Sequence, residues 1–189
     1  MQQRSLGSFR VSAIGLGCMN ICHAYGAPVS EQQAERVLLA ALDAGVTHFD
    51  TAALYGFGAS ETLVGKFLSK HRSKFTLASK CGMQGVPNEQ GVKVRVIDGR
   101  PATIKATCEA ALKRLQTDVI DLYQIHWPAR NVPTFGQIIF DPSKDKACAS
   151  IQEQLEALAG LVQAGKVRAV GLSNESPYGV HEFVRLAEQ

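Results

Sequence analysis

The chain has 189 residues, of which 46% are hydrophobic and 20% are charged, a composition ordinary for one globular domain with a sizeable core. The formal net charge of +3 is small and the charges are interspersed, which argues against a polybasic surface for nucleic acid or membranes. No apolar run reaches the length of a membrane span, and the N-terminus lacks the apolar core of a signal peptide, so we expect a cytoplasmic protein.

The cysteines predict neither a disulfide framework nor a metal site. They are odd in number and irregularly spaced, so we expect them to be reduced packing residues: Cys18, Cys22, Cys81, Cys108 and Cys148. Cys18 and Cys22, followed by His23, are conceivable metal ligands. No second Cys/His pair stands at zinc spacing, so we expect no metal.

The first elements along the chain are a hairpin and a glycine-containing segment. Residues 4–6 and 9–11 flank Gly7-Ser8, which predicts a tight hairpin ahead of the main fold. Residues 14–19 follow with two glycines. No helix opens on these glycines, so they do not form a dinucleotide-binding fingerprint.

A helix and a short buried strand come next. Ser30-x-x-Gln33 is a capping box, and apolar residues then recur on one helical face: Ala34, Val37, Leu38, Ala41 and Leu42. Gly45 suits the left-handed position that ends a helix. The β-rich run that follows predicts a strand over 46–50 ending on Asp50, with Tyr55 on the loop after it.

The middle of the chain repeats this order. Ser60 and Glu61 suit the start of a second helix, with Leu63, Val64, Phe67 and Leu68 facing inward. A strand over 75–80 then ends on Lys80. Residues 82–99 hold several glycines and polar residues and predict a loop at the active end, with a local ribbon over 92–97.

The last third continues the pattern. Pro101 fits the first turn of a third helix, and a strand over 119–126 ends on His126. Residues 127–149 form a long connection without a clear period, which in a compact domain is usually functional. A capping box at Ser150 and Glu153 then opens a helix with Ile151, Leu155, Leu158 and Val162 on its stripe. A strand over 167–172 precedes a last helix with Val180, Phe183, Val184 and Ala187 inward.

Helices and strands that alternate in this way predict parallel strands covered by helices. Two architectures compete, a doubly wound open sheet and a (β/α) barrel. A doubly wound dinucleotide fold would carry a G-x-G-x-x-G turn after its first strand, where this chain has Asp50-Thr51-Ala52-Ala53. We therefore favour an α/β fold of the (β/α) barrel type.

Four residues stand where barrel chemistry is expected. Asp50, Lys80 and His126 end three successive strands and Tyr55 lies on the first loop, so all four face one rim. A free phenol, with a pKa of ~10, is too weak an acid at neutral pH, and a nearby ammonium lowers that value. A proton donor aimed at a carbonyl, without a metal or a nucleophilic Ser or Cys pair, indicates carbonyl reduction.

Three motifs in this order resemble the aldo-keto reductase family. They are Gly45-Val46-Thr47-His48-Phe49-Asp50-Thr51-Ala52 with Tyr55-Gly56 and Glu61-x-x-Val64-Gly65; Asp121-Leu122-Tyr123-Gln124-Ile125-His126-Trp127-Pro128; and Gly165-Lys166-Val167-Arg168-Ala169-Val170-Gly171-Leu172-Ser173-Asn174. The long loop with Phe135-Gly136 is most similar to the bacterial Tas-like branch of the family.

The resemblance implies reduction of an aldehyde or ketone with NADPH. It assigns Tyr55 as general acid, Lys80 as the group that lowers the Tyr55 pKa, Asp50 as the partner of Lys80, and His126 as the residue that orients the carbonyl. Ser173 and Asn174, together with Asp50, would bind the cofactor. The substrate would be a small carbonyl compound, with no nucleic acid or membrane partner.

Members of this family are usually much longer, and the resemblance leaves their strands five to eight beyond the last predicted helix. The resemblance therefore implies that residues 1–189 form one partial domain of the (β/α)8 TIM-barrel type. We expect about the first four β/α units, which carry the tetrad but only part of the cofactor site. A nucleotide-binding accessory subunit of the same fold and an inactive truncated remnant are the alternatives. If two apolar side chains per strand stay wet on the inner face, the chain should associate through its open edges.

Overall fold

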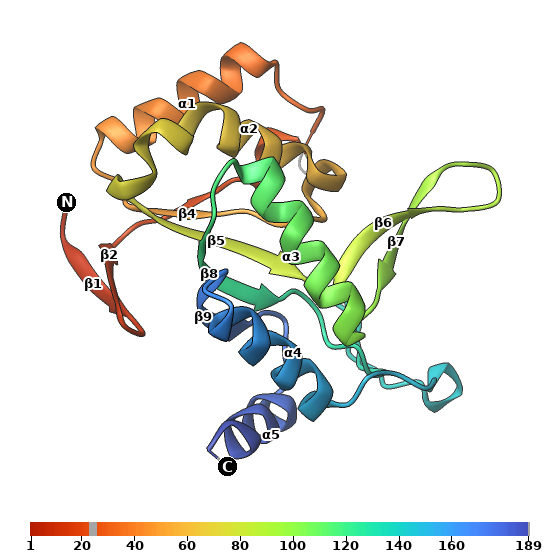
Figure 1. The fold of residues 1–189 in the computed structure, drawn as a ribbon. Coiled ribbons are helices and arrows are strands. Elements are labelled where there is room, and N and C mark those ends of the chain that lie inside the picture. Colours follow the sequence, from red (N-terminus) through yellow and green to blue (C-terminus); the bar gives the residue numbers. More distant parts are fainter. Residues whose placement is uncertain (23–25, 189) are drawn as a thin grey trace.

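The computed structural model describes residues 1–22 and 26–188, in which strands and helices alternate along the chain (Figure 1). The strands are β1 (Gln3–Leu6), β2 (Phe9–Ser12), β3 (Leu16–Gly17), β4 (His48–Asp50), β5 (Thr76–Cys81), β6 (Met83–Pro87), β7 (Lys93–Ile97), β8 (Ile120–Ile125) and β9 (Val167–Leu172). The α-helices are α1 (Glu31–Asp43), α2 (Ala59–Leu68), α3 (Pro101–Leu115), α4 (Ile151–Gln163) and α5 (Pro177–Ala187). Short 3-10 helices are η1 (Met19–Ile21), η2 (Tyr55–Gly58), η3 (Ser69–Lys74) and η4 (Pro142–Lys144).

The main sheet has five parallel strands in the order β3-β4-β5-β8-β9. Neighbours in the sheet follow one another along the chain once the β6–β7 hairpin is set aside. A doubly wound sheet reverses its order at a switch point, and this sheet does not. The sheet order therefore supports the barrel type over the doubly wound alternative, and the parallel α/β architecture with an N-terminal hairpin is confirmed.

One strand of the sheet was not predicted. Leu16–Gly17 forms β3, which pairs in parallel with β4 through Leu16–Phe49 and Gly17–Asp50. A two-residue strand beside glycines carries no β-rich or alternating pattern, so sequence periodicity cannot reveal it. The sheet therefore has five parallel strands, one more than the four predicted, and each of the five is followed by a helix. The sheet edges are β3 and β9, and β4 is not an edge.

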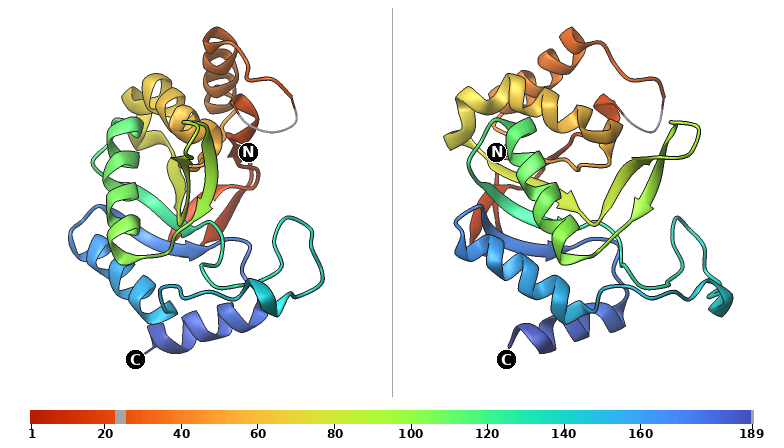
Figure 2. Two further views of the ribbon diagram at one scale, coloured as in Figure 1. Left: turned by 90° about the vertical axis from the view of Figure 1, so that its right-hand side faces the viewer. Right: turned by 45° about the vertical axis from the view of Figure 1, so that its right-hand side comes forward.

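Two hairpins lie at opposite ends of this sheet (Figures 1 and 2). β1 and β2 pair at the amino end, where Ser12 N donates to Thr47 Oγ1 and Thr47 N donates to Ser12 Oγ, both at 2.8 Å. At the carboxyl end the ribbon expected over 92–97 is a complete antiparallel hairpin of β6 and β7. The long connection after β8 leaves the same end.

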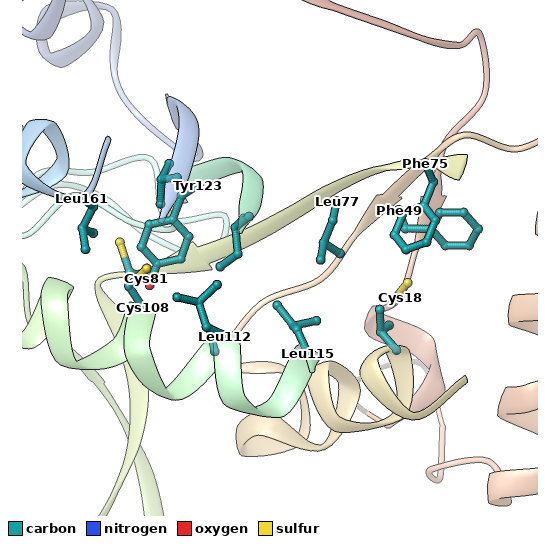
Figure 3. Packing of buried hydrophobic residues seen from close by; sticks show 14 of the residues in the cluster. Cys18, Phe49, Phe75, Leu77, Cys81, Cys108, Leu112, Leu115, Tyr123 and Leu161 are labelled. Carbon is teal, nitrogen blue, oxygen red and sulfur yellow. The ribbon is translucent and has the colours of Figure 1, made fainter. Parts of the chain in front are cut away.

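The core lies between one face of the sheet and the helices α1 to α4. Phe49, Leu77 and Tyr123 point from three neighbouring strands into this layer, and Leu115 of α3 meets them there (Figure 3). The rings of Phe49 and Phe75 meet edge to face with centroids 5.0 Å apart. Cys18, Cys81 and Cys108 are buried in the same layer, and burial raises the pKa of each thiol to about 12. Of the two other cysteines, Cys22 is half-buried and Cys148 is exposed, so Cys148 is not a packing residue.

The opposite, inner face of the sheet is small and polar. It carries Asp50, Ala78, Lys80, Leu122, Gln124 and Gly171. Leu122 is the one large apolar side chain in this set. The expectation of two wet apolar side chains per strand is therefore wrong, because polar site residues occupy the inward positions near the strand ends.

The helix stripes are narrower than predicted. On α5, Phe183 is buried, whereas Val180 and Val184 are exposed. Val37 on α1 and Val162 on α4 are exposed as well. Each of these valines lies at the border of its apolar stripe, where the neighbouring element no longer covers it. None of the described helices has both the length and the apolar composition needed to cross a membrane.

Candidate active site

Tyr55 is placed by an unusually tight turn. It opens η2, in which Gly56, Phe57 and Gly58 all have positive φ values. A Cβ on Gly56 would lie 2.9 Å from Ala59 Cβ and 3.0 Å from Cys22 Sγ, so this position requires glycine. The turn brings the Tyr55 side chain back over the carboxyl end of the sheet, where it is buried.

Lys80, near the end of β5, joins the predicted residues. Its Nζ contacts Asp50 Oδ1 in an ion pair, donates to the Thr51 carbonyl at 3.0 Å, and lies 3.3 Å from the Tyr55 hydroxyl. These contacts match the three donors of an ammonium group. Lys80 is only 5% exposed, so water competes little for them. The structure thus brings Asp50, Tyr55 and Lys80 together.

Asp50 has a second partner that was not predicted. Gln124 Nε2 donates to Asp50 Oδ2 at 3.1 Å, so both carboxylate oxygens are engaged. Gln124 lies on β8 two residues before His126 and therefore on the same side of the strand. That period-two spacing is the signal that could have found it. Gln124 was not predicted, because it lies within β8 and not at its end.

His126 follows β8 and closes the group. Its ring lies edge to face with the Tyr55 ring, with centroids 5.6 Å apart and planes at 83°. The backbone fixes the residue from two sides: its N–H donates to the Cys81 carbonyl at 2.9 Å, and its carbonyl accepts from Asn174 Nδ2 at 2.8 Å. All four predicted catalytic residues therefore meet at one rim of the sheet.

Ser173 and Asn174 follow β9 and lie beside His126. Ser173 N donates to the Ile125 carbonyl at 2.9 Å, and Asn174 takes a left-handed conformation with φ of 54°. Asn174 Nδ2 also lies 2.9 Å from Ser173 Oγ. This turn is held by an ion pair between Arg130 and Glu175, which sequence reasoning missed because the two residues are far apart in the chain.

An apolar cluster forms the wall beside Tyr55. Besides Tyr55 itself, its buried members are Ala52, Leu54 and Met83, and the residues packed against it are Met19, Phe57, Ile97 and Trp127. The Trp127 ring stacks on Phe135 of the long connection with centroids 4.4 Å apart. The surroundings of Tyr55 are therefore polar on the side of Lys80 and apolar on the side of Trp127.

A buried carboxylate supports Lys80 from behind. Glu61 of α2 accepts from Ser79 Oγ at 2.5 Å and from Arg114 Nε at 2.7 Å, and it is fully buried. Burial raises the pKa of Glu61, and the Arg114 guanidinium opposes that rise. Ser79 precedes Lys80 on β5, so this network ties the strand that carries the lysine to both α2 and α3.

No metal site accompanies these residues. Within residues 1–22 and 26–188, no group of three or more His, Cys, Asp or Glu side chains is placed to hold a metal ion. His23, weighed above as a ligand with Cys18 and Cys22, lies outside the described part of the chain.

Sequence comparison with known proteins identifies the family of the chain. A model of the Aldo/keto reductase family matches residues 13–186. Protein tas of Escherichia coli K12 is 35% identical over 96% of this chain and 54% of its own length. Probable aldo-keto reductase 1 of Glycine max is 38% identical over 89% of this chain and 43% of its own length. The chain thus spans about half the length of these curated relatives.

Solved structures agree. Aldo-keto reductase AKR11C1 from Bacillus halodurans, in its holo form, has a TM-score of 0.77 at 33% identity and aligns with 98% of this chain and 54% of its own. An aldo/keto reductase from Klebsiella pneumoniae in complex with NADP and acetate has a TM-score of 0.67 at 31% identity, over 95% of this chain and 51% of its own. With a family model that matches nearly its whole length, this chain belongs to the aldo/keto reductase family.

Proposed function

We propose that this chain supplies the catalytic part of an NADPH-dependent reductase that converts an aldehyde or ketone to an alcohol. One observation carries the proposal: Nζ of the buried Lys80 contacts both the Asp50 carboxylate and the Tyr55 hydroxyl. Residues 1–189 would act as one partial barrel domain.

The residues after β9 fit the carboxamide of a nicotinamide. Asn174 is exposed, and its Nδ2 donates to the His126 carbonyl, whereas no described residue donates a hydrogen bond to its amide oxygen. That oxygen accepts hydrogen bonds and the Ser173 hydroxyl both donates and accepts, which complements a primary amide. Asp50, Ser173 and Asn174 are thus the cofactor-binding residues that we propose. Bound NADPH would supply the hydride for the carbonyl carbon.

The Tyr55 hydroxyl then donates its proton to the carbonyl oxygen, so that hydride and proton together give the alcohol. The Lys80 ammonium stabilises the phenolate that Tyr55 becomes, because opposite charges attract strongly at a site shielded from water. Asp50 holds Lys80 in reach, and Gln124 holds Asp50. His126, edge to face with the Tyr55 ring, borders the same oxygen and orients the substrate.

The proposal can be tested with a fusion protein that completes the barrel, called the fused barrel below. This chain would be joined to the segment of Protein tas that lies beyond their alignment, and NADPH oxidation followed with 4-nitrobenzaldehyde. We expect turnover in the fusion and negligible turnover in the 189-residue chain alone. A folded fusion that binds NADPH without turnover would overturn the proposal and favour a nucleotide-binding accessory role.

A further inference from the structure

The β6–β7 hairpin turns one defined face toward the Tyr55 turn. Met83 pairs with Ile97, Gly85 with Arg95, and Pro87 with Lys93, and side chains of such pairs share one face. Met83 and Ile97 belong to the apolar cluster beside Tyr55. A Cβ on Gly85 would lie 2.0 Å from Phe57 Cδ1, so the Phe57 ring rests directly on this face.

Two cations share this face and rest against aromatic rings. Lys93 Nζ lies 5.7 Å from the centroid of the Phe57 ring, and Arg95 Cζ lies 4.8 Å from that of Phe135. Phe135 stacks on Trp127, the residue after His126. Two rings in contact, those of Trp127 and Phe135, therefore connect the residue next to His126 with the Arg95 guanidinium.

No described acidic residue pairs with these two cations. In the part of the chain that the structure describes, neither Lys93 nor Arg95 forms an ion pair, whereas Asp98 just after the hairpin is held by Arg100. A guanidinium stacked on a ring keeps its edge N–H groups available for a carboxylate. The rim of the site is thus positively charged on the hairpin side and apolar below it.

From this arrangement we infer that the substrate class is an aromatic aldehyde or ketone that carries a carboxylate. The inference rests on the proposed function. The carbonyl lies at Tyr55 and His126, the apolar body lies against Trp127, and the carboxylate pairs with Arg95. Arg95 is therefore a specificity-determining residue, and Lys93 adds to the positive potential along the same face.

Binding can be measured without turnover, because Trp127 is the single tryptophan of the chain and lies in the stack. Fluorescence titrations of the 189-residue chain would compare 4-formylbenzoate with its neutral analogue 4-formylbenzamide. We expect the anion to bind at least ~10-fold more tightly, as one charge-assisted contact provides. Arg95→Gln should remove this preference and leave the amide affinity unchanged, and Arg95→Lys should retain part of it.

The matched control is Arg36→Gln, which removes the same charge from the exposed side of α1. All variants are compared at the same oligomeric state by size-exclusion chromatography. Equal affinities for acid and amide, or an equal loss of both in Arg95→Gln, would overturn the inference and leave Arg95 as a residue that holds the loop through Phe135. Tighter binding of NADP⁺ that depends on Arg95 would overturn it too, in favour of a cofactor contact.

The two proposals fail in different ways. If the anion binds preferentially but the fused barrel does not reduce it, the recognition site stands and the reductase proposal falls. If the fused barrel reduces acid and amide with equal kcat/KM, the reductase proposal stands and the substrate inference falls.

Discussion

Gln124 Nε2 donates a hydrogen bond to Asp50 Oδ2 at 3.1 Å, from the strand that His126 follows. The other oxygen of Asp50 contacts Lys80. A carboxylate held at both oxygens cannot rotate freely, so the position of Lys80 beneath the Tyr55 hydroxyl depends on a residue of a third strand. The site is therefore a property of the sheet, because three neighbouring strands must be in register to form it.

Replacement of Gln124 by Leu should weaken catalysis in the fused barrel without removing a reacting group. We expect kcat to fall ~10-fold with KM little changed, because the lost contact, worth about 1–2 kcal/mol beside a charge, positions Lys80 and does not bind substrate. Steady-state kinetics would check this. Gln163→Leu, at an exposed position on α4, is the control. An unchanged kcat would show that Lys80 alone fixes Asp50.

Replacement of Tyr55 by Phe in the same fusion should remove the proton donor while the fold persists. We expect reduction to slow at least ~10²-fold, the low end for lost general acid catalysis. The melting temperature should change little, because the substitution removes one hydroxyl and leaves the ring, which lies edge to face with the His126 ring, in place. Tyr178→Phe, on the exposed face of α5, is the control. Full turnover in Tyr55→Phe would place the acid elsewhere.

The sequence predicted the parts of this site that follow from strand ends. Asp50, Lys80 and His126 each follow a β-rich run, and parallel strands bring such positions together. Contacts between distant segments leave no such local pattern. Gln124 looks like an ordinary strand residue, and the Arg130–Glu175 ion pair joins a loop to a helix start 45 residues away. The strand β3 was missed because pairing with β4, and not its own residues, makes it a strand.

His48 should make stability depend on pH. Burial lowers the pKa of His48 below its ordinary value of 6.5, and the negative charge of Asp50 opposes this shift. The Nδ1 atom of His48 is buried and has no hydrogen bond to any described residue. The unfolded chain thus takes up this proton at a higher pH than the folded chain does. The contribution of neutral His48 to the free energy of unfolding is fully present above a pH of about 6.5. It falls as the pH decreases through the pKa of the folded state, by at most about 1.4 kcal/mol per pH unit.

Urea unfolding of the wild type and of His48→Gln, above and below a pH of about 6.5, would measure how stability depends on pH. The variant should lose less stability on acidification than the wild type. His181→Gln, at an exposed position, should behave as the wild type does. Parallel pH profiles of His48→Gln and wild type would contradict the prediction.

Two helical glycines should respond in opposite directions to alanine. A Cβ on Gly65 of α2 would lie 2.2 Å from the Arg114 carbonyl oxygen, which is backbone and cannot move aside easily. Gly65→Ala should therefore force α2 and α3 apart and cost ~1–3 kcal/mol or more. Gly160 of α4 has no atom within 4 Å of such a Cβ, so Gly160→Ala should stabilise by ~0.5–1 kcal/mol. Thermal unfolding would compare them, and a neutral Gly65→Ala would mean that the helices can separate cheaply.

The last prediction concerns the edge of the sheet. β9 pairs with β8 on one side, and within the described chain no strand pairs with its other side. It carries Val170, which is 40% exposed, and the neighbouring α5 exposes Val180 and Val184. Such an edge is a template for pairing with another chain. Because the inner face is mostly small and polar, only a few apolar side chains forgo burial, at ~1.5–3 kcal/mol each. This loss lies within the ~5–15 kcal/mol by which whole domains are stable.

We therefore expect the 189-residue chain to be folded but self-associated through β9. Size-exclusion chromatography with light scattering should find dimers or larger species, and Val170→Lys should shift them toward monomer because a charge on an edge strand opposes pairing. Val162→Lys places the same charge on an exposed valine of α4 and should leave association unchanged. A sharp monomer peak with a cooperative melt for the wild type would contradict the edge argument, since an unpaired strand would then be tolerated in water.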